Sequence, residues 1–256
     1  MAENKNLYPT LVIKNNPNPN RLLAFPLLGI LIKIILLIPV LIEAFFLAFA
    51  GLALFLITPF VILFTGKYWE AAYDFFLGYF KFNTKIKLYL YGITDKYPGF
   101  GLDDNGVFTL KIDKPKSPSR AMAFPILGFI ARLILQIPYR LFGAILSYGE
   151  VIAVLFSWFT VLFTGKYPES LYEFISDATR INLASQIYMF YLSDSYPSFA
   201  MKIKNQTVKI LLIIAGTLLI LSRFGNAINE AKKSKDDRFQ NNKYNYPNQK
   251  YNYPDK

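Results

Sequence analysis

Two long apolar blocks, residues 22–64 and 121–163, constrain the fold more than any other feature of the chain. As one straight helix each block would be about 64 Å long, whereas the hydrocarbon core of a bilayer is about 30 Å thick. Each block therefore predicts two antiparallel membrane helices that turn near Pro39 or Pro138, because proline breaks a helix. The first arm is short, so each hairpin either crosses twice or is re-entrant. We expect two crossings.

The two blocks belong to an internal duplication. A shift of 99 positions superposes Arg21 on Arg120, and residues 64–68 (Phe-Thr-Gly-Lys-Tyr) on residues 163–167, without a gap. Self-similarity at a fixed period indicates one supersecondary unit used twice.

Each unit has the same expected order of elements. Residues 10–14 and 108–112 alternate apolar with polar side chains, which favours strands. A third such segment, 199–204, would join them in a small sheet beside the membrane. The expected organisation is a first unit 1–103 (hairpin 22–64, amphipathic helices 68–93), a second unit 104–204 (hairpin 121–163, amphipathic helices 168–193), a C-terminal membrane helix 205–225 and a disordered polar tail 226–256. The fold class is thus a mainly α, polytopic membrane protein built from two tandem helical hairpins.

The aromatic-rich stretches 68–93 and 168–193 carry charged residues on one helical face and aromatic residues largely on the other. This pattern suits a helix in the membrane interface, where the rings of Trp and Tyr contact lipid and their polar groups contact water. It suits equally an amphipathic helix packed on the sheet. Residues 208–224 form a further apolar run, which predicts one span, and the Asn- and Lys-rich residues after it predict disorder.

The charge distribution predicts how the chain sits. The formal net charge of +11 indicates an anionic membrane surface as neighbour, and nucleic acid is not expected. Basic residues cluster outside the apolar blocks, which places the N-terminus and both amphipathic stretches in the cytoplasm. The chain has no Cys and no His, which removes thiolate nucleophiles, imidazole catalysis and Cys/His metal sites. We therefore expect no enzyme activity, no cofactor and no bound metal.

Charged residues inside the apolar blocks are candidate site residues, because a charge in hydrocarbon costs several kcal/mol unless it is paired. Arg132 and Glu150 would meet across the second hairpin, and we predict an ion pair there. Lys33, the equivalent of Arg132, would reach Glu43 or extend to the interface. Such charges either lock the hairpin or line an ion, proton or lipid path.

The Thr-Gly-Lys-Tyr turns are the other candidate. Gly66 and Gly165 suit a helix end with positive φ. The residues expected to contact anionic lipid or the interface are Lys67, Lys166, Arg21 and Arg120. Asp95 and Asp194, each before a Tyr-Pro motif, are expected to pin a turn.

These motifs resemble the domain of unknown function 4389 family. The resemblance rests on Tyr8-Pro9, on the turn at residues 164–168 (Thr-Gly-Lys-Tyr-Pro) and on the Asp-x-Tyr-Pro-x-Phe ends at residues 95–100 and 194–199. In the first unit Trp69 replaces the proline of the turn. The resemblance implies a bacterial or archaeal cell-membrane protein and brings no activity, cofactor or catalytic residue.

The functional expectation is a non-enzymatic, multi-pass membrane protein that acts as an accessory or scaffold subunit of a larger membrane complex. Its partners would be the lipid bilayer, with anionic lipids on the cytoplasmic side, and other membrane subunits. The alternative is a small transporter or a lipid-handling membrane protein.

Overall fold

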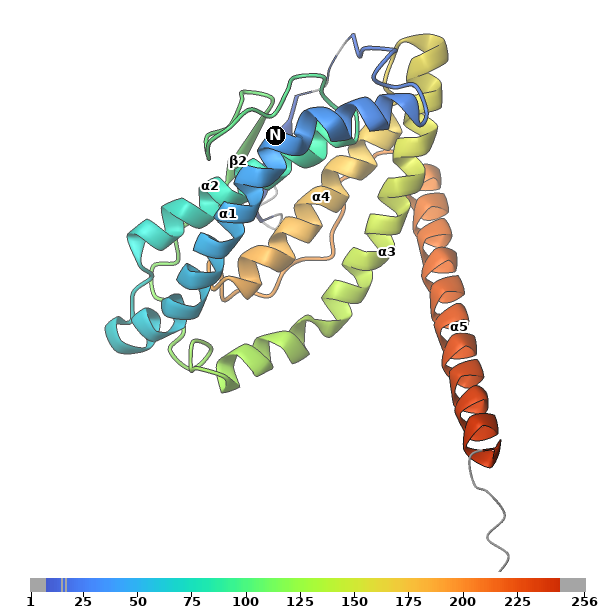
Figure 1. The fold of residues 1–256 in the computed structure, drawn as a ribbon. Coiled ribbons are helices and arrows are strands. Elements are labelled where there is room, and N and C mark those ends of the chain that lie inside the picture. Colours follow the sequence, from blue (N-terminus) through green and yellow to red (C-terminus); the bar gives the residue numbers. More distant parts are fainter. Residues whose placement is uncertain (1–7, 15, 17, 245–256) are drawn as a thin grey trace, which may run out of the picture.

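The structure, a computed structural model, describes residues 8–14, 16 and 18–244 (Figure 1). This part of the chain is mainly helical. Its elements are β1 (Thr10–Ile13), α1 (Leu28–Thr65), α2 (Glu70–Leu90), β2 (Phe108–Lys111), α3 (Leu127–Thr164), α4 (Glu169–Met189) and α5 (Gln206–Tyr244). Helix α1 packs on α2, and α3 packs on both α4 and α5.

Each apolar block forms one continuous helix, so the prediction of two antiparallel arms is wrong. Helix α1 runs through Pro39 and α3 through Pro138, and Figure 1 shows α3 bending midway. A proline inside a helix kinks it, whereas a reversal needs turn-forming residues. The sequence Leu-Leu-Ile-Pro-Val-Leu-Ile around Pro39 has no Gly, Asn, Asp or Ser. Helices α1, α3 and the Gln206–Arg238 part of α5 are long and apolar enough to cross a membrane.

Both long helices end as their sequences predict. Gly66 follows α1 with φ of 70°, and Gly165 follows α3 with φ of 72°. In each case the glycine N–H donates to a carbonyl of the last turn, that of Ile62 or Val161 (2.8 Å). Glycine adopts this left-handed conformation without the steric cost of a Cβ. The predicted positive-φ helix ends are confirmed.

Helices α2 and α4 form the interior of the protein. Both amphipathic stretches are helical, as predicted. On α2 the side chains of Ala72, Phe76 and Phe80 are fully buried. Helix α4 is buried on most of its surface, including the polar residues Thr179 and Arg180. Helix α4 packs on α3 and also contacts β1, so the alternative of an amphipathic helix packed on the sheet describes only part of its surroundings.

The sheet within the described residues has two strands, β1 and β2, which pair antiparallel. The predicted third strand, residues 199–204, is not formed. Side chains of α4 bond its backbone: Asp177 accepts from the Lys202 N–H, Glu173 accepts from the Lys204 N–H (3.0 Å), and Arg180 donates to the Ala200 carbonyl (2.5 Å). These acceptors and donors replace the ladder that a neighbouring strand would supply.

The two units exchange contacts. Tyr73 of the first unit donates its hydroxyl to the Ile112 carbonyl of the second. Its equivalent, Tyr172, donates to the Ile13 carbonyl of the first. A tyrosine from the other unit therefore bonds the last residue of β1 and the residue directly after β2.

Helix α5 is longer than predicted. The expected membrane helix ended at residue 225, yet α5 continues to Tyr244. Residues 226–244, assigned above to a disordered tail, are therefore helical, whereas residues 245–256 lie outside the described residues. Figure 1 shows α5 running beside α3 and then beyond the rest of the protein.

Candidate functional site

Arg132 of α3 is buried, with its side chain only 1% exposed. The guanidinium donates to the carbonyls of Met122 (3.3 Å), Tyr188 (2.6 Å) and Ser193 (3.1 Å), and it pairs with Asp194. It also lies over the Tyr188 ring, 4.7 Å from the centroid. Several donors of one guanidinium are thus used in a fixed geometry, as arginine allows.

The predicted ion pair between Arg132 and Glu150 is not formed, because α3 is one helix. At about 1.5 Å per residue the two positions lie about 27 Å apart along its axis. Glu150 instead accepts two hydrogen bonds from the Lys87 ammonium (2.7 and 3.0 Å) and one from the Thr179 hydroxyl (3.1 Å). Its side chain is 1% exposed and that of Lys87 is 24% exposed.

The Lys87–Glu150 ion pair joins the two units. Lys87 comes from α2 of the first unit, and Glu150 from α3 of the second. A buried carboxylate stays charged only when partners replace water, and here an ammonium and a hydroxyl do so. Lys87 is not among the predicted site residues, because its partner belongs to the other unit.

Lys33 and Glu43 do not pair either, so the second predicted pair is also wrong. Lys33 is fully buried, with its Nζ 5.6 Å from the Tyr89 ring centroid and 5.9 Å from that of Trp158. In the described chain its ammonium has no hydrogen-bond partner. One Glu43 oxygen accepts from the Gly101 N–H (2.8 Å). The two residues share α1 and lie about 15 Å apart along its axis.

Lys85 of α2 is a further buried charge, from the charged face of the amphipathic stretch 68–93. Its Nζ donates to the Gly101 carbonyl (2.9 Å), so Gly101 bonds both Lys85 and Glu43. Burial lowers the pKa of Lys85, and the nearby Glu43 carboxylate acts in the opposite direction. These contacts fix the loop after α2 onto the middle of α1.

Asp95 and Asp194 pin the segments that lead into the long helices. Asp95 accepts from the Asn20 N–H and Asp194 from the Ser119 N–H, each at 2.7 Å. The two bonds are equivalent under the 99-residue shift. This agrees with the predicted pinning of a turn, and the partner in each unit is the segment that precedes the long helix.

The four predicted lipid-contact residues gather in two pairs, each built from both units. The Arg120 guanidinium lies against Gly66, so close that a Cβ there would be 2.7 Å from Nη2. Gly66 directly precedes Lys67. Likewise Arg21 lies against Gly165, where a Cβ would be 2.9 Å from Nη2, and Lys166 follows. All four cationic residues are exposed. We call these the two Arg–Lys pairs.

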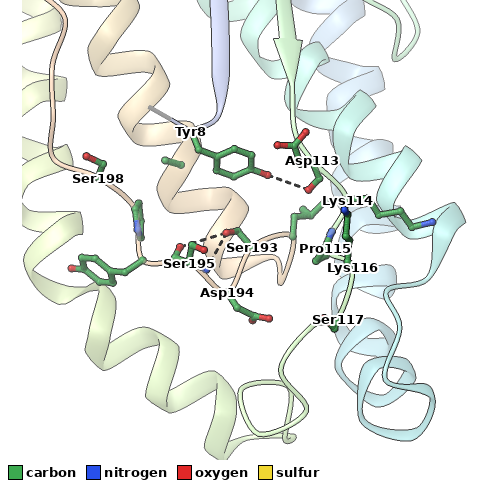
Figure 2. Close-up of a pocket in the computed structure, with 14 residues that line it drawn as sticks. Tyr8, Asp113, Lys114, Pro115, Lys116, Ser117, Ser193, Asp194, Ser195 and Ser198 are labelled. Carbon is green, nitrogen blue, oxygen red and sulfur yellow. Dashed lines mark hydrogen bonds between the residues drawn. The ribbon is translucent and has the colours of Figure 1, made fainter. Parts of the chain in front are cut away.

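A polar cavity of about 590 Å³ lies beside Asp194. Figure 2 shows Tyr8 reaching across it to the Asp113 carbonyl (3.3 Å). The loop 193–198 supplies serine hydroxyls on one side, and the loop 113–117 supplies two lysines on the other. With no His in the chain, these serines have no imidazole base. The cavity offers hydrogen bonds and charges for binding a small polar molecule.

Comparison with known proteins gives one result. A family model described as a domain of unknown function (DUF4389) matches residues 28–101 and again residues 127–201. The two matches begin at the first residue of α1 and of α3, and they confirm the predicted tandem copies. No curated protein and no solved structure matches the chain.

Proposed function

We propose that this chain, which belongs to the DUF4389 family and carries the family's domain twice, has a non-enzymatic role in the cell membrane. It would act there as a scaffold or accessory subunit. The protein would hold a partner membrane protein through α5, with its N-terminus in the cytoplasm. Helix α5 carries the proposal. After Phe224 it continues for about 30 Å, and the described side chains from residue 225 to residue 238 are all exposed.

A polar helix whose described side chains are exposed is typical of a segment that bridges to another domain or protein. The buried charges support a scaffold over a transporter. A transport site places polar groups around broken helices near the middle of the membrane. Here Arg132 bonds three carbonyls and Asp194, and Glu150 bonds Lys87 and Thr179, so these groups are committed to internal contacts.

The test is extraction of the native protein in mild detergent, followed by native size analysis and mass spectrometry. We expect a stoichiometric partner protein with the full chain, and its loss from a variant that stops after Phe224. The partner-free size of that variant should be unchanged apart from the missing residues. A full chain that travels only with copies of itself would contradict the scaffold role.

The two Arg–Lys pairs favour a second function, binding of anionic lipid. Each pair places two exposed cations where an apolar helix ends, and the arrangement occurs twice. Guanidinium and ammonium groups are the side chains that bind phosphate. Lipid retained after purification should fall in the Lys67→Gln/Arg120→Gln variant and stay unchanged in Lys111→Gln, an exposed lysine on the sheet. Equal retention in all three proteins would rule out these pairs as the lipid contacts.

A further inference from the structure

Equivalent residues of the two units face each other in the small sheet, which fixes an approximate two-fold axis. Leu11 pairs with Leu110, its equivalent 99 positions later, in the antiparallel register of β1 and β2. The two-fold axis of an antiparallel strand pair stands perpendicular to the sheet. It therefore passes between these two residues and leaves the protein through the exposed face of the sheet.

The same axis relates the ends of the long helices. Arg21, in the segment that leads into α1, lies against Gly165 at the end of α3. Arg120, in the segment that leads into α3, lies against Gly66 at the end of α1. The start of each long helix is therefore beside the end of the other.

The two units have similar sequences and therefore a similar affinity for a membrane. The two-fold axis that relates them must place both units equally in the membrane, so it lies either in the membrane plane or along the membrane normal. An axis in the plane would place the Leu11–Leu110 pair at the centre of the bilayer. The outer face of that sheet exposes Thr10, Val12, Thr109 and Lys111, and within the described residues no third strand pairs with either edge. Lipid-exposed sheet edges do not occur in hydrocarbon, and an exposed lysine is costly there. The axis therefore lies along the normal.

An axis along the normal has a direct consequence for depth. Rotation about the normal leaves depth unchanged, so Gly66 and Gly165 lie at the same depth. Arg21 touches Gly165 and shares that depth. Both ends of α1, and by symmetry both ends of α3, are thus on one side of the membrane.

We propose that α1 and α3 do not cross the bilayer, and that each lies as a bent helix within one leaflet below a water-exposed sheet. This rests on the proposed membrane location of the protein. It agrees with the length of each helix, about 57 Å at 38 residues. It also agrees with the outer face of α1, where large apolar side chains are exposed at helical spacing: Leu31, Ile35, Ile38, Ile42, Phe45 and Phe49. Both Arg–Lys pairs then meet the same headgroup layer.

The natural absence of cysteine makes the test direct. Single variants Asn18→Cys (before α1), Lys67→Cys (after α1) and Lys111→Cys (on the sheet) are treated in sealed vesicles of known orientation with a membrane-impermeant maleimide. We expect all three to react from the same side. Reaction of Asn18→Cys and Lys67→Cys from opposite sides would overturn the proposal.

A depth measurement gives an independent readout. Ile38 and its equivalent Ile137 are 51% and 63% exposed, so a probe on either one faces outward. Probes on Ile38→Cys and Ile137→Cys should be quenched equally by quenchers confined to one leaflet. Quenching of the two from opposite leaflets would contradict the proposal.

Alkaline carbonate extraction separates the two possible failures. A protein that stays in the membrane and shows opposite-sided labelling refutes the in-leaflet arrangement alone. A protein that carbonate releases refutes the membrane location, and with it both proposals.

Discussion

At the residue scale, Lys33 and Arg132 occupy equivalent positions with unequal partners. Arg132 pairs with Asp194, the equivalent of Asp95. Lys33 has no hydrogen-bond partner in the described chain and no ion pair with Asp95. An ammonium is a point charge on a flexible stem, whereas a guanidinium presents a fork of five donors. The same backbone position is thus stabilising in one unit and costly in the other.

This difference predicts unequal mutants. Arg132→Met should lower the free energy of unfolding in detergent by about 3–5 kcal/mol, because it leaves buried carbonyls without their donor and Asp194 without its ion-pair partner. The matched variant Lys33→Met removes a buried cation that lacks a hydrogen bond, so the free energy of unfolding should stay the same or rise. Denaturant unfolding followed by Trp fluorescence measures both. Equal losses would show that Lys33 has a partner of similar worth.

The Lys87–Glu150 pair gives a second residue-scale prediction. Lys87→Met leaves the Glu150 carboxylate buried with only Thr179 as donor, and should cost about 3–5 kcal/mol of unfolding free energy. The double variant Lys87→Met/Glu150→Leu removes both charges and should recover most of that loss. A double variant no more stable than Lys87→Met alone would mean that the contact acts through packing and not through charge.

At the element scale, the ends of α1 and α3 depend on glycine for two reasons. Gly66 and Gly165 both have positive φ, and both carry an arginine guanidinium where a Cβ would lie. Gly66→Ala and Gly165→Ala should each lower the free energy of unfolding by about 1–2 kcal/mol. Gly225→Ala is the control, because nothing lies near Gly225 and it sits inside α5. There alanine should stabilise the helix by up to about 1 kcal/mol. Three equal effects would argue against a role for the turns.

The element scale also shows how far the sequence can predict the fold. Periodicity predicted α2 and α4, and turn chemistry predicted the ends of α1 and α3. The prediction of hairpins failed because it compared the length of each apolar block with the bilayer thickness, and this comparison assumed a helix perpendicular to the membrane. Composition predicted disorder after residue 225, yet helix propensity of residues such as Ala231, Lys232 and Lys233 continues α5.

The candidate site was harder to predict than the elements, because its contacts cross between units. Alignment of the repeats identifies Arg120 and Lys67 as residues of interest, but it does not show which turn Arg120 contacts. Arg120 contacts Gly66 because the segment before each long helix lies against the end of the long helix of the other unit. For the same reason the sequence paired Glu150 with Arg132 in its own unit, whereas its partner Lys87 belongs to the other.

At the scale of the whole molecule, this exchange predicts that neither unit is stable alone. Residues 1–103 retain β1 but lose β2, the Tyr172 bond and the Glu150 partner of Lys87. Expressed separately, residues 1–103 and 104–256 should be degraded, and expressed together they should co-purify in equal amounts. A stable first unit on its own, seen by its accumulation in the membrane fraction, would contradict this.

The pairing of Leu11 with Leu110 gives the chain the geometry of a symmetric homodimer, in which a strand, a tyrosine and an arginine of each copy contact the other copy. A homodimer must repeat every residue in both of its subunits. Here both copies belong to one polypeptide, so they are free to differ, and the first has Gly51 where the second has Glu150.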